Sequence, residues 1–426
     1  MLPLNAPGPA ARPALPPGYE RQLVALLFCT WGTVFLDRMA QLYLAPYFAP
    51  EFHLSSEQIG VLASVLAITW ALSGFFFGAL SDRFGRRKVL IPAVFLFSAL
   101  SLLSGLARTF PQLLAIRALM GAAEGPCWAV ITALIEESSP PGRRGRNVGW
   151  VVSAAALVGL AAAPVLTTQL AARLGWRMAF IVSGLPGLLL GVLLAKYVRE
   201  PERRAAHGPA SHAAPGEWLD YLSVLRYRNI WLCALAAVGF MTWLFLEHVF
   251  APLYITQVAH QSGTTAGFLL GASGLGSFFL VILLPALSDR VGRKPMLLAV
   301  ALLSTVVPVA LQIPSLYGHL WLLAAIVFIT NGGQCMPALL LVLIPTESVP
   351  ARFAATAIGL VTLVGEVIGA TLAPALGGKL AGEFGLGLTL WMSAGGTALV
   401  FLASLFLKET AGAKSRAAEL APVPAD

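Results

Sequence analysis

The segment GALSDRFGRRK, residues 78–88, returns in altered form as PALSDRVGRKP at residues 285–295, and the two copies lie 207 residues apart. A second pair of segments, ESSPPGRRG at 137–145 and ESVPARFAA at 347–355, is separated by 210 residues. Because two landmarks keep nearly one offset, the sequence predicts that the chain is a duplication of one structural unit.

The composition of the 426-residue chain indicates a membrane protein. Hydrophobic residues make up 58% of it and charged residues only 11%, with a mean hydropathy of +0.79, whereas a typical soluble domain is about 25% charged. The apolar segments are continuous rather than alternating, which excludes a transmembrane β-barrel. Twelve segments approach the length of about 20 residues that a helix needs to cross the hydrocarbon core. They lie at about 22–47, 57–81, 88–107, 110–136, 147–172, 178–198, 230–256, 264–288, 295–313, 319–345, 353–378 and 387–407.

The duplication and the segment count together predict an all-α membrane protein, with twelve transmembrane helices in two pseudo-symmetric six-helix bundles. The predicted parts are a disordered cytosolic tail (1–20), an N-terminal bundle (21–198), a cytosolic linker (199–229), a C-terminal bundle (230–408) and a second cytosolic tail (409–426). Within the linker, Trp218, Leu222 and Leu225 recur at helical spacing. This spacing favours a helix lying on the membrane surface, and a plain linker helix is the alternative.

The positive charges orient the predicted helices. Most of the 28 Lys and Arg residues lie in the two tails and in the loops on the same side as the tails. Positive charge accumulates on the cytoplasmic side of membrane proteins. We therefore expect both termini in the cytoplasm of a multi-pass protein of the cell (inner) membrane. The net charge of +8 needs no nucleic-acid partner to explain it.

The repeated motif has a physical reading as a gate. Its glycines allow the chain to reverse between two helices, its aspartates can accept hydrogen bonds, and its basic residues face the anionic leaflet. We expect an ionic contact that forms in one conformation and breaks in another, and topology signalling alone is the alternative. The candidate gating residues are Asp82, Arg83, Gly85, Arg86, Arg87, Asp289, Arg290, Gly292 and Arg293.

The pattern G-x-x-x-D-R-x-G-R-R at 78–87, with its partial copy in the second half, resembles the signature of the major facilitator superfamily. The resemblance extends over residues 20–410. It implies two six-helix bundles around a central cavity, and transport by alternating access of that cavity to the two sides of the membrane.

Several ionisable residues interrupt the apolar segments, namely Asp37, Arg38, Arg117, Glu124, Glu247, His248 and Glu366. A charge at the bilayer centre costs roughly 2.5–3.5 kcal/mol on insertion scales, so each is expected to face a cavity or a partner. Asp37 shares one helix face with Thr33 and Gln41, which lie four residues before and after it. Arg117 shares a face with Glu124, because seven residues return within about 20° on a helix. Pairing these acids and bases across the bundle lowers the cost of burying them, and a buried carboxyl group can carry a proton.

The combination of LDR at 36–38 with RALMGAAEGP at 117–126 resembles the anion:cation symporter branch of this superfamily. The resemblance implies that Asp37 and Glu124 are proton-coupling carboxylates, and that Arg38 and Arg117 bind the substrate anion or a partner carboxylate. Spinster-like lipid transporters share part of this pattern. The chain departs from the sugar-acid symporters at Glu366 and at FLEH (245–248).

The extra ionisable residues, Glu247, His248 and Glu366, leave three roles open: binding a cationic group, carrying a second proton, or pairing with each other. Further candidates for lining the cavity are Gln41, Tyr43, Trp128, Asn331 and Gln334, each with a packing role as the alternative.

The sequence thus predicts a monomeric secondary transporter that couples symport of a small organic anion, a carboxylate, to the proton gradient. The alternative is a proton-coupled exporter of an amphipathic or cationic compound, such as a drug or a Spinster-like lysolipid. The sequence contains no nucleophile motif, P-loop or metal-ligand pattern, so neither an enzyme nor a cofactor or metal site is predicted. The expected partners are the substrate, protons and the lipid bilayer.

Overall fold

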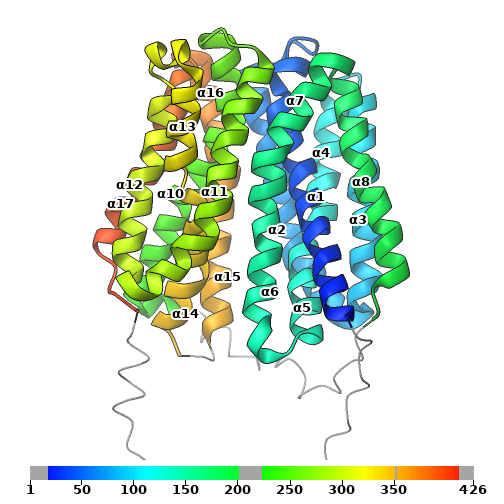
Figure 1. The fold of residues 1–426 in the computed structure, drawn as a ribbon, viewed down its shortest axis with the longest axis vertical. Coiled ribbons are helices and arrows are strands. Elements are labelled where there is room, and N and C mark those ends of the chain that lie inside the picture. The colour runs from blue at the N-terminus through cyan, green and yellow to red at the C-terminus, as the bar shows by residue number, and fades with distance from the viewer. Residues whose placement is uncertain (1–17, 201–222, 351–352, 412–426) are drawn as a thin grey trace, which may run out of the picture.

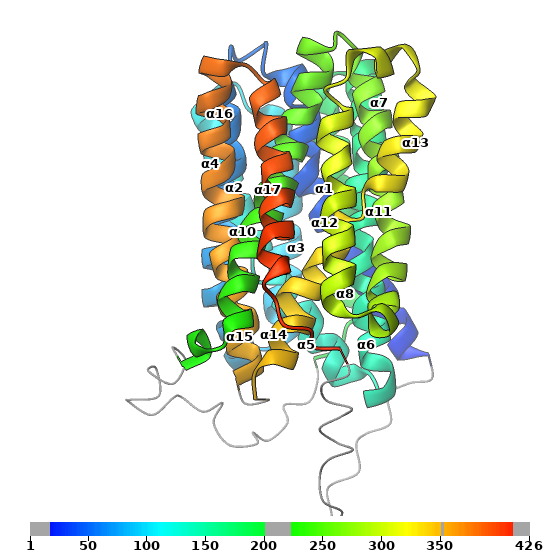
Figure 2. The same cartoon turned by 90° about the vertical axis from the view of Figure 1, so that its left-hand side faces the viewer.

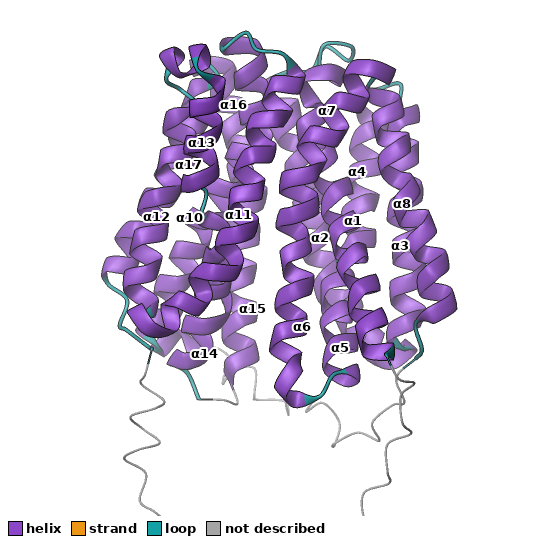
Figure 3. Cartoon of the chain, viewed as in Figure 1, coloured by secondary structure: helices purple, strands orange, loops and turns teal. Residues whose placement is uncertain are grey.

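The computed structural model describes residues 18–200, 223–350 and 353–411. The described chain is built from long helices joined by short loops (Figure 3). Twelve of them are long and apolar enough to cross a membrane, as predicted. Figure 1 shows two halves side by side, with the N-terminal half in blue to green and the C-terminal half in green to red.

The N-terminal half supplies six spans. The first three are α1 (Tyr19–Phe48), α2 (Ser56–Phe84) and α3 (Arg86–Leu106). The fourth is α4 (Phe110–Glu124) followed by α5 (Cys127–Ser138). The fifth is α6 (Pro141–Ala154), η1 (Ala155–Ala162) and α7 (Ala163–Leu174), and the sixth is α8 (Trp176–Tyr197).

The C-terminal half repeats this plan, and Figure 2 shows it from its outer side. After the short η2 (Ser223–Arg226), its first three spans are α10 (Arg228–Leu253) with η3 (Tyr254–Val258), α11 (Gly263–Val291) and α12 (Arg293–Ala310). After η4 (Pro314–Gly318), the fourth span comprises α13 (Leu320–Thr330), η5 (Gly333–Cys335), η6 (Ala338–Leu343) and α14 (Ile344–Ser348). The last two are α15 (Ala354–Val364) with η8 (Gly365–Leu372) and α16 (Ala373–Phe384), and then α17 (Gly387–Leu405).

The duplication is visible in local backbone geometry. The π-helical segments η1 and η8 occupy equivalent positions, and each is followed by an Ala-Pro pair. Gly85 and Gly292, the glycines of the repeated motif, have nearly equal φ angles of 106° and 111°. These angles lie in the region that only glycine adopts at little cost, so the motif glycines permit the sharp reversal between spans.

The two halves pack closely at the face opposite the helix ends Tyr19 and Leu405. There α2 contacts α16, and α7 contacts α11. A Cβ atom at Gly60 would collide with the backbone of Pro374, and one at Gly267 would collide with Thr168. Small residues allow helix backbones to approach where lipid provides no hydrophobic drive for association. The halves are therefore closed against each other at this face.

The predicted surface helix of the linker lies largely outside the described residues. Trp218 and Leu222 are not described, and Leu225 belongs to η2.

Candidate substrate and proton site

The structure buries all seven ionisable residues that were predicted to lie inside the spans. Their side chains are between 0 and 6% exposed, and they come from α1, α4, α10 and η8: Asp37, Arg38, Arg117, Glu124, Glu247, His248 and Glu366. Helix α1 packs on α10, and α10 packs on η8. The charges of the two halves therefore meet in the interior of the molecule.

Asp37 is held by a hydroxyl group of the third span. Ser101 Oγ donates to Asp37 Oδ1 at 2.8 Å, whereas Asp37 Oδ2 is buried without a hydrogen-bond partner. The positive charge that stabilises Asp37 electrostatically is Arg117. One oxygen of this carboxyl group is thus positioned by the protein, and the other is free to take a proton.

Arg117 is positioned by neutral groups. Its Nη2 donates to Ser104 Oγ at 3.1 Å, and its Nη1 lies 3.1 Å from Met120 Sδ. The guanidinium carbon lies 5.1 Å from the centre of the Phe180 ring, an arrangement that stabilises a cation.

The predicted pairing of acids and bases across the N-terminal half is indirect. Glu124 is attracted by both Arg38 and Arg117. Yet among the described residues neither Asp37 nor Glu124 has an arginine nitrogen within 4.0 Å. Both carboxylate oxygens of Glu124 are buried without a hydrogen-bond donor. Such a group is costly unless it is protonated or a ligand completes its contacts.

Arg38 has different neighbours from Asp37. Its guanidinium carbon lies 4.9 Å from the centre of the Trp70 ring and 5.3 Å from that of Phe245. Two carboxyl groups are within its electrostatic range, Glu124 and Glu366. Arg38 therefore has aromatic contacts from both halves of the molecule and an acid from each half.

A second group of polar residues centres on α10. Both oxygens of Glu247 lack a hydrogen-bond partner, as do the hydroxyl group of Tyr43 and Nε1 of Trp243. His248 Nδ1 lies 2.8 Å from the carbonyl oxygen of Leu244, and its ring centre is 6.4 Å from that of Tyr43. The structure brings Tyr43, from the N-terminal half, to His248 and Glu247 of the C-terminal half.

The tenth span is broken where the candidates Asn331 and Gln334 lie. Helix α13 ends at Thr330, and Asn331 Nδ2 donates to Ser273 Oγ at 2.5 Å. Asn331 Oδ1 and Gln334 Nε2 are buried without partners. Irregular backbone inside a membrane is tolerated where it is buried in protein or lines a cavity.

The candidates Trp128 and Gln41 differ in surroundings. Trp128 is half-buried and lies 4.8 Å, between ring centres, from Trp31. Gln41 is fully buried, and its Nε2 has no partner. Gln41 therefore has unused hydrogen-bonding capacity, whereas Trp128 contributes an aromatic surface.

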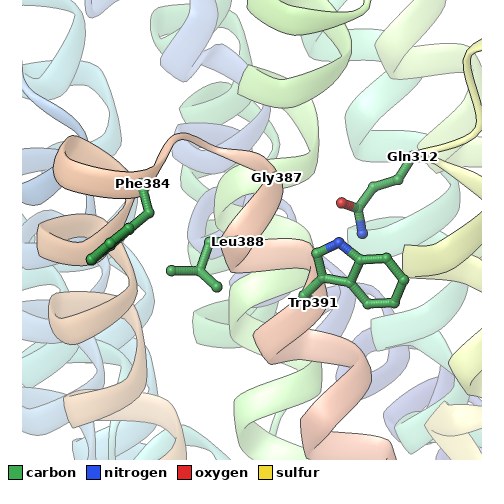
Figure 4. Close-up of a pocket in the computed structure, with 5 residues that line it drawn as sticks. All are labelled: Gln312, Phe384, Gly387, Leu388 and Trp391. Atoms are coloured by element: carbon green, nitrogen blue, oxygen red, sulfur yellow. The ribbon is translucent and has the colours of Figure 1, made fainter.

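Two surface hollows, of about 550 and 520 Å³, lie away from these charges. The first is lined by Gln312, Trp391 and Phe384 near the junction of α16 and α17 (Figure 4). The second includes Arg21 and Trp150. Neither contains a candidate site residue, so the buried charges remain the candidate site.

The repeated motif forms the same contacts in both halves. In the N-terminal copy, Glu200 accepts from the backbone N–H groups of Arg86 and Arg87, at 2.6 and 2.9 Å. Arg86 also lies 3.4 Å from Glu137.

In the C-terminal copy, Glu409 accepts from the N–H groups of Arg293 and Lys294, at 2.8 and 3.0 Å. The guanidinium of Arg293 lies 3.0 Å from Glu347 and 2.6 Å from Asp289. These contacts cap α3 and α12 within each half.

The side chains of Asp82 and Arg83 lie outside the described residues. The predicted gating contact, which forms in one conformation and breaks in another, stays a prediction.

The neutral residues that position the charges were not predicted from the sequence. They are Ser101 and Ser104 of α3, Trp70, Phe180, Phe245 and Ser273. The serines of α3 could have been found in the sequence, because Ser98, Ser101 and Ser104 recur every three residues in an apolar segment. The aromatic partners could not, because aromatic residues are common throughout membrane helices.

Two helical halves with a repeated motif and an interior lined by charges define a secondary transporter, not an enzyme. The chain belongs to the Major Facilitator Superfamily, whose model matches residues 26–370 and 249–425. This confirms the resemblance predicted from the motif.

Several of its relatives belong to the anion:cation symporter branch. The chain is 30% identical over 289 residues to a probable 4-methylmuconolactone transporter of Cupriavidus pinatubonensis, a match covering 66% of this chain and 65% of the relative. It is 28% identical over 414 residues to the cis,cis-muconate transport protein of Acinetobacter baylyi, covering 89% and 95%. A hexuronate transporter of Bacillus subtilis is 30% identical over 238 residues, covering 55% and 56%.

Solved structures confirm the fold. A bacterial homologue of the human lysosomal transporter Spinster, in an inward-facing and unoccupied conformation, superposes with a TM-score of 0.75 at 19% identity, covering 92% of this chain and 98% of that one. The nucleoside transporter NupG superposes with a TM-score of 0.73 at 13% identity, covering 92% and 100%.

Proposed function

We propose that this protein imports a small organic carboxylate together with protons. The observation that carries the proposal is the incomplete pairing of the buried charges. Two arginines, Arg38 and Arg117, lie near buried carboxyl groups without a direct ion pair among the described residues. A guanidinium presents a planar fork of donors that matches a carboxylate.

The relatives support a carboxylate as the substrate. Muconate and hexuronate, which appear in the names of two of them, carry carboxylate groups. A probable L-galactonate transporter of Escherichia coli is also related, with 26% identity over 274 residues.

The charges suggest how protons and substrate are coupled. Arg117 attracts both Asp37 and Glu124, and Arg38 also attracts Glu124. When Asp37 and Glu124 are ionised, they attract the arginines that the substrate must bind. Protonation removes this competition, so that substrate and protons occupy the site together. Uptake of one proton for each substrate carboxylate gives the loaded site the same net charge as the empty site while the two halves reorient.

The proposed direction of transport rests on the direction of the proton gradient. With both termini in the cytoplasm, the closed face at Gly60 and Gly267 is the outer face. Closure at this face then means that the buried site is closed to the outside of the cell. The proton gradient across a cell membrane then favours import.

The substrate class is tested with purified protein in liposomes. We expect an inside-alkaline pH gradient to drive accumulation of radiolabelled cis,cis-muconate or D-glucuronate, and to leave choline, a cation without a carboxylate, unaffected. Proton-driven movement of a cationic or lipid substrate in the opposite direction, with no carboxylate uptake, would support the exporter instead.

A further inference from the structure

The contacts of Arg38 join the two halves of the molecule. Arg38 lies on α1 of the N-terminal half, its guanidinium between Trp70 of α2 and Phe245 of α10. The Trp70 ring belongs to the same half as Arg38, and the Phe245 ring to the other. Arg38 is only 6% exposed, so its charge needs a partner inside the protein.

Two acids attract Arg38, and they come from different halves. Glu124 ends α4 of the N-terminal half, and Glu366 lies in η8 of the C-terminal half. Neither lies within 4.0 Å of an Arg38 nitrogen in the described structure. Arg38 Nε and Glu366 Oε2 are both buried and lack hydrogen-bond partners. A buried cation and a buried acid that attract each other without contact indicate an incomplete site.

Among the described residues, one cation acts on the charge of Glu366. Arg38 is the positive group that acts on it. Helix α10, which packs against η8, brings Glu247 and His248, and α4 brings Glu124. The charged residues of α16 and the one described charged side chain of α2 lie toward the helix ends, at Lys379, Glu383 and Glu57.

We propose that Glu366 is an internal competitor for Arg38, which the carboxylate of the substrate displaces. This inference rests on the proposed function. In the empty site, ionised Glu366 compensates the charge of Arg38. When the substrate carboxylate binds Arg38, Glu366 loses its compensating cation and takes one proton from the aqueous phase. For Arg38 and Glu366 alone, the substrate adds one negative charge and the proton one positive charge, so the net charge at this pair is unchanged.

The exchange also changes the attraction between the halves. Arg38 and Glu366 attract each other across the interface when the site is empty. With the substrate bound and Glu366 protonated, that attraction is removed. Substrate binding and the relative movement of the halves are thereby linked through one positioning residue.

The test is the affinity of the purified full-length protein for cis,cis-muconate and D-glucuronate, measured by isothermal titration calorimetry at pH 6 and pH 8. At pH 8 we expect Glu366→Gln to bind the better of the two acids about tenfold more tightly than the unsubstituted protein, a typical size for such coupling. Its affinity is also expected to depend less on pH, because one proton-linked competitor is gone. Glu383→Gln, on the exposed end of α16, is the matched control and should leave both quantities unchanged.

Proton uptake provides the second measurement. Titration in two buffers of different ionisation enthalpy gives the protons taken up on binding, and Glu366→Gln should take up fewer. If the glutamine variant does not fold, Glu366→Ala replaces it in both measurements. The same changes in affinity, pH dependence and proton uptake are expected of it. Unchanged or weaker binding at pH 8, with unchanged proton uptake, would overturn the role of Glu366. Failure of the unsubstituted protein to bind either acid would instead contradict the proposed function, and this inference with it.

Discussion

At the scale of single residues, the buried charges depend on neutral neighbours. The Ser101 hydroxyl donates to Asp37, and the Ser104 hydroxyl accepts from Arg117. Both serines lie on α3, which itself carries no charge at this depth. The third span thus orients the buried acid of the first span, which we propose to couple protons, and the arginine of the fourth.

We expect Ser101→Ala to destabilise the protein by about 1–3 kcal/mol, because it leaves a buried acid without its donor. The matched control is Ser98→Ala on the same helix. Ser98 is equally buried, but its hydroxyl group has no hydrogen-bond partner, so its loss should cost little. Equilibrium unfolding in detergent measures both effects. Equal destabilisation by the two substitutions would show that the Ser101 contact contributes nothing specific.

At the scale of elements, each half fixes the start of its third span with a glutamate that follows its sixth span. Glu200 caps α3 and Glu409 caps α12. Burial raises the pKa of the Glu409 carboxyl group, and backbone N–H groups, among them those of Ala411, Arg293 and Lys294, lower it by more. The net result is a pKa below the ordinary value of 4.5.

This shift predicts a pH dependence with a definite sign. A group whose pKa is lower in the folded state stabilises the fold above its unfolded pKa, and this contribution is lost as the pH falls through the folded value. Glu409→Gln should therefore lower the unfolding temperature at pH 7 and make no difference well below pH 4. Exposed Glu383→Gln is the control. A Glu409→Gln effect that persists undiminished in acid would refute the electrostatic cap.

At the scale of the whole molecule, much of the fold was predictable from periodicity and repeats. The twelve spans and the duplication follow from apolar segment length and from the offset between the motif copies, because both are properties of the chain alone. The burial of Asp37, Arg117 and Glu124 was predictable because each lies inside an apolar segment long enough to cross the membrane. The rings that contact Arg38 were not, because Trp70 and Phe245 meet it only through packing between helices.

The closure of the face at Gly60 and Gly267, which we propose to be the outer one, depends on glycines at the contacts between the halves. Gly60→Val should force α2 away from α16, because a side chain there meets the backbone of Pro374. Gly395→Val is the control, since nothing lies within 4 Å of a Cβ at that position. The test uses a variant in which the native cysteines are removed and buried Gln41 is replaced by cysteine. This cysteine should react faster with an external thiol reagent when Gly60→Val is also present. Equal reaction rates in both variants would contradict the assignment of this face as the closed one.

The central claim is that the buried acids couple protons to substrate, and Glu124→Gln tests it most directly. The glutamine keeps the shape of the side chain but cannot change its charge. In liposomes with an inside-alkaline gradient, the unsubstituted protein is predicted to accumulate its carboxylate substrate. Glu124→Gln is predicted to lose uphill accumulation and to retain exchange between labelled and unlabelled substrate. Undiminished uphill accumulation by Glu124→Gln would contradict the account.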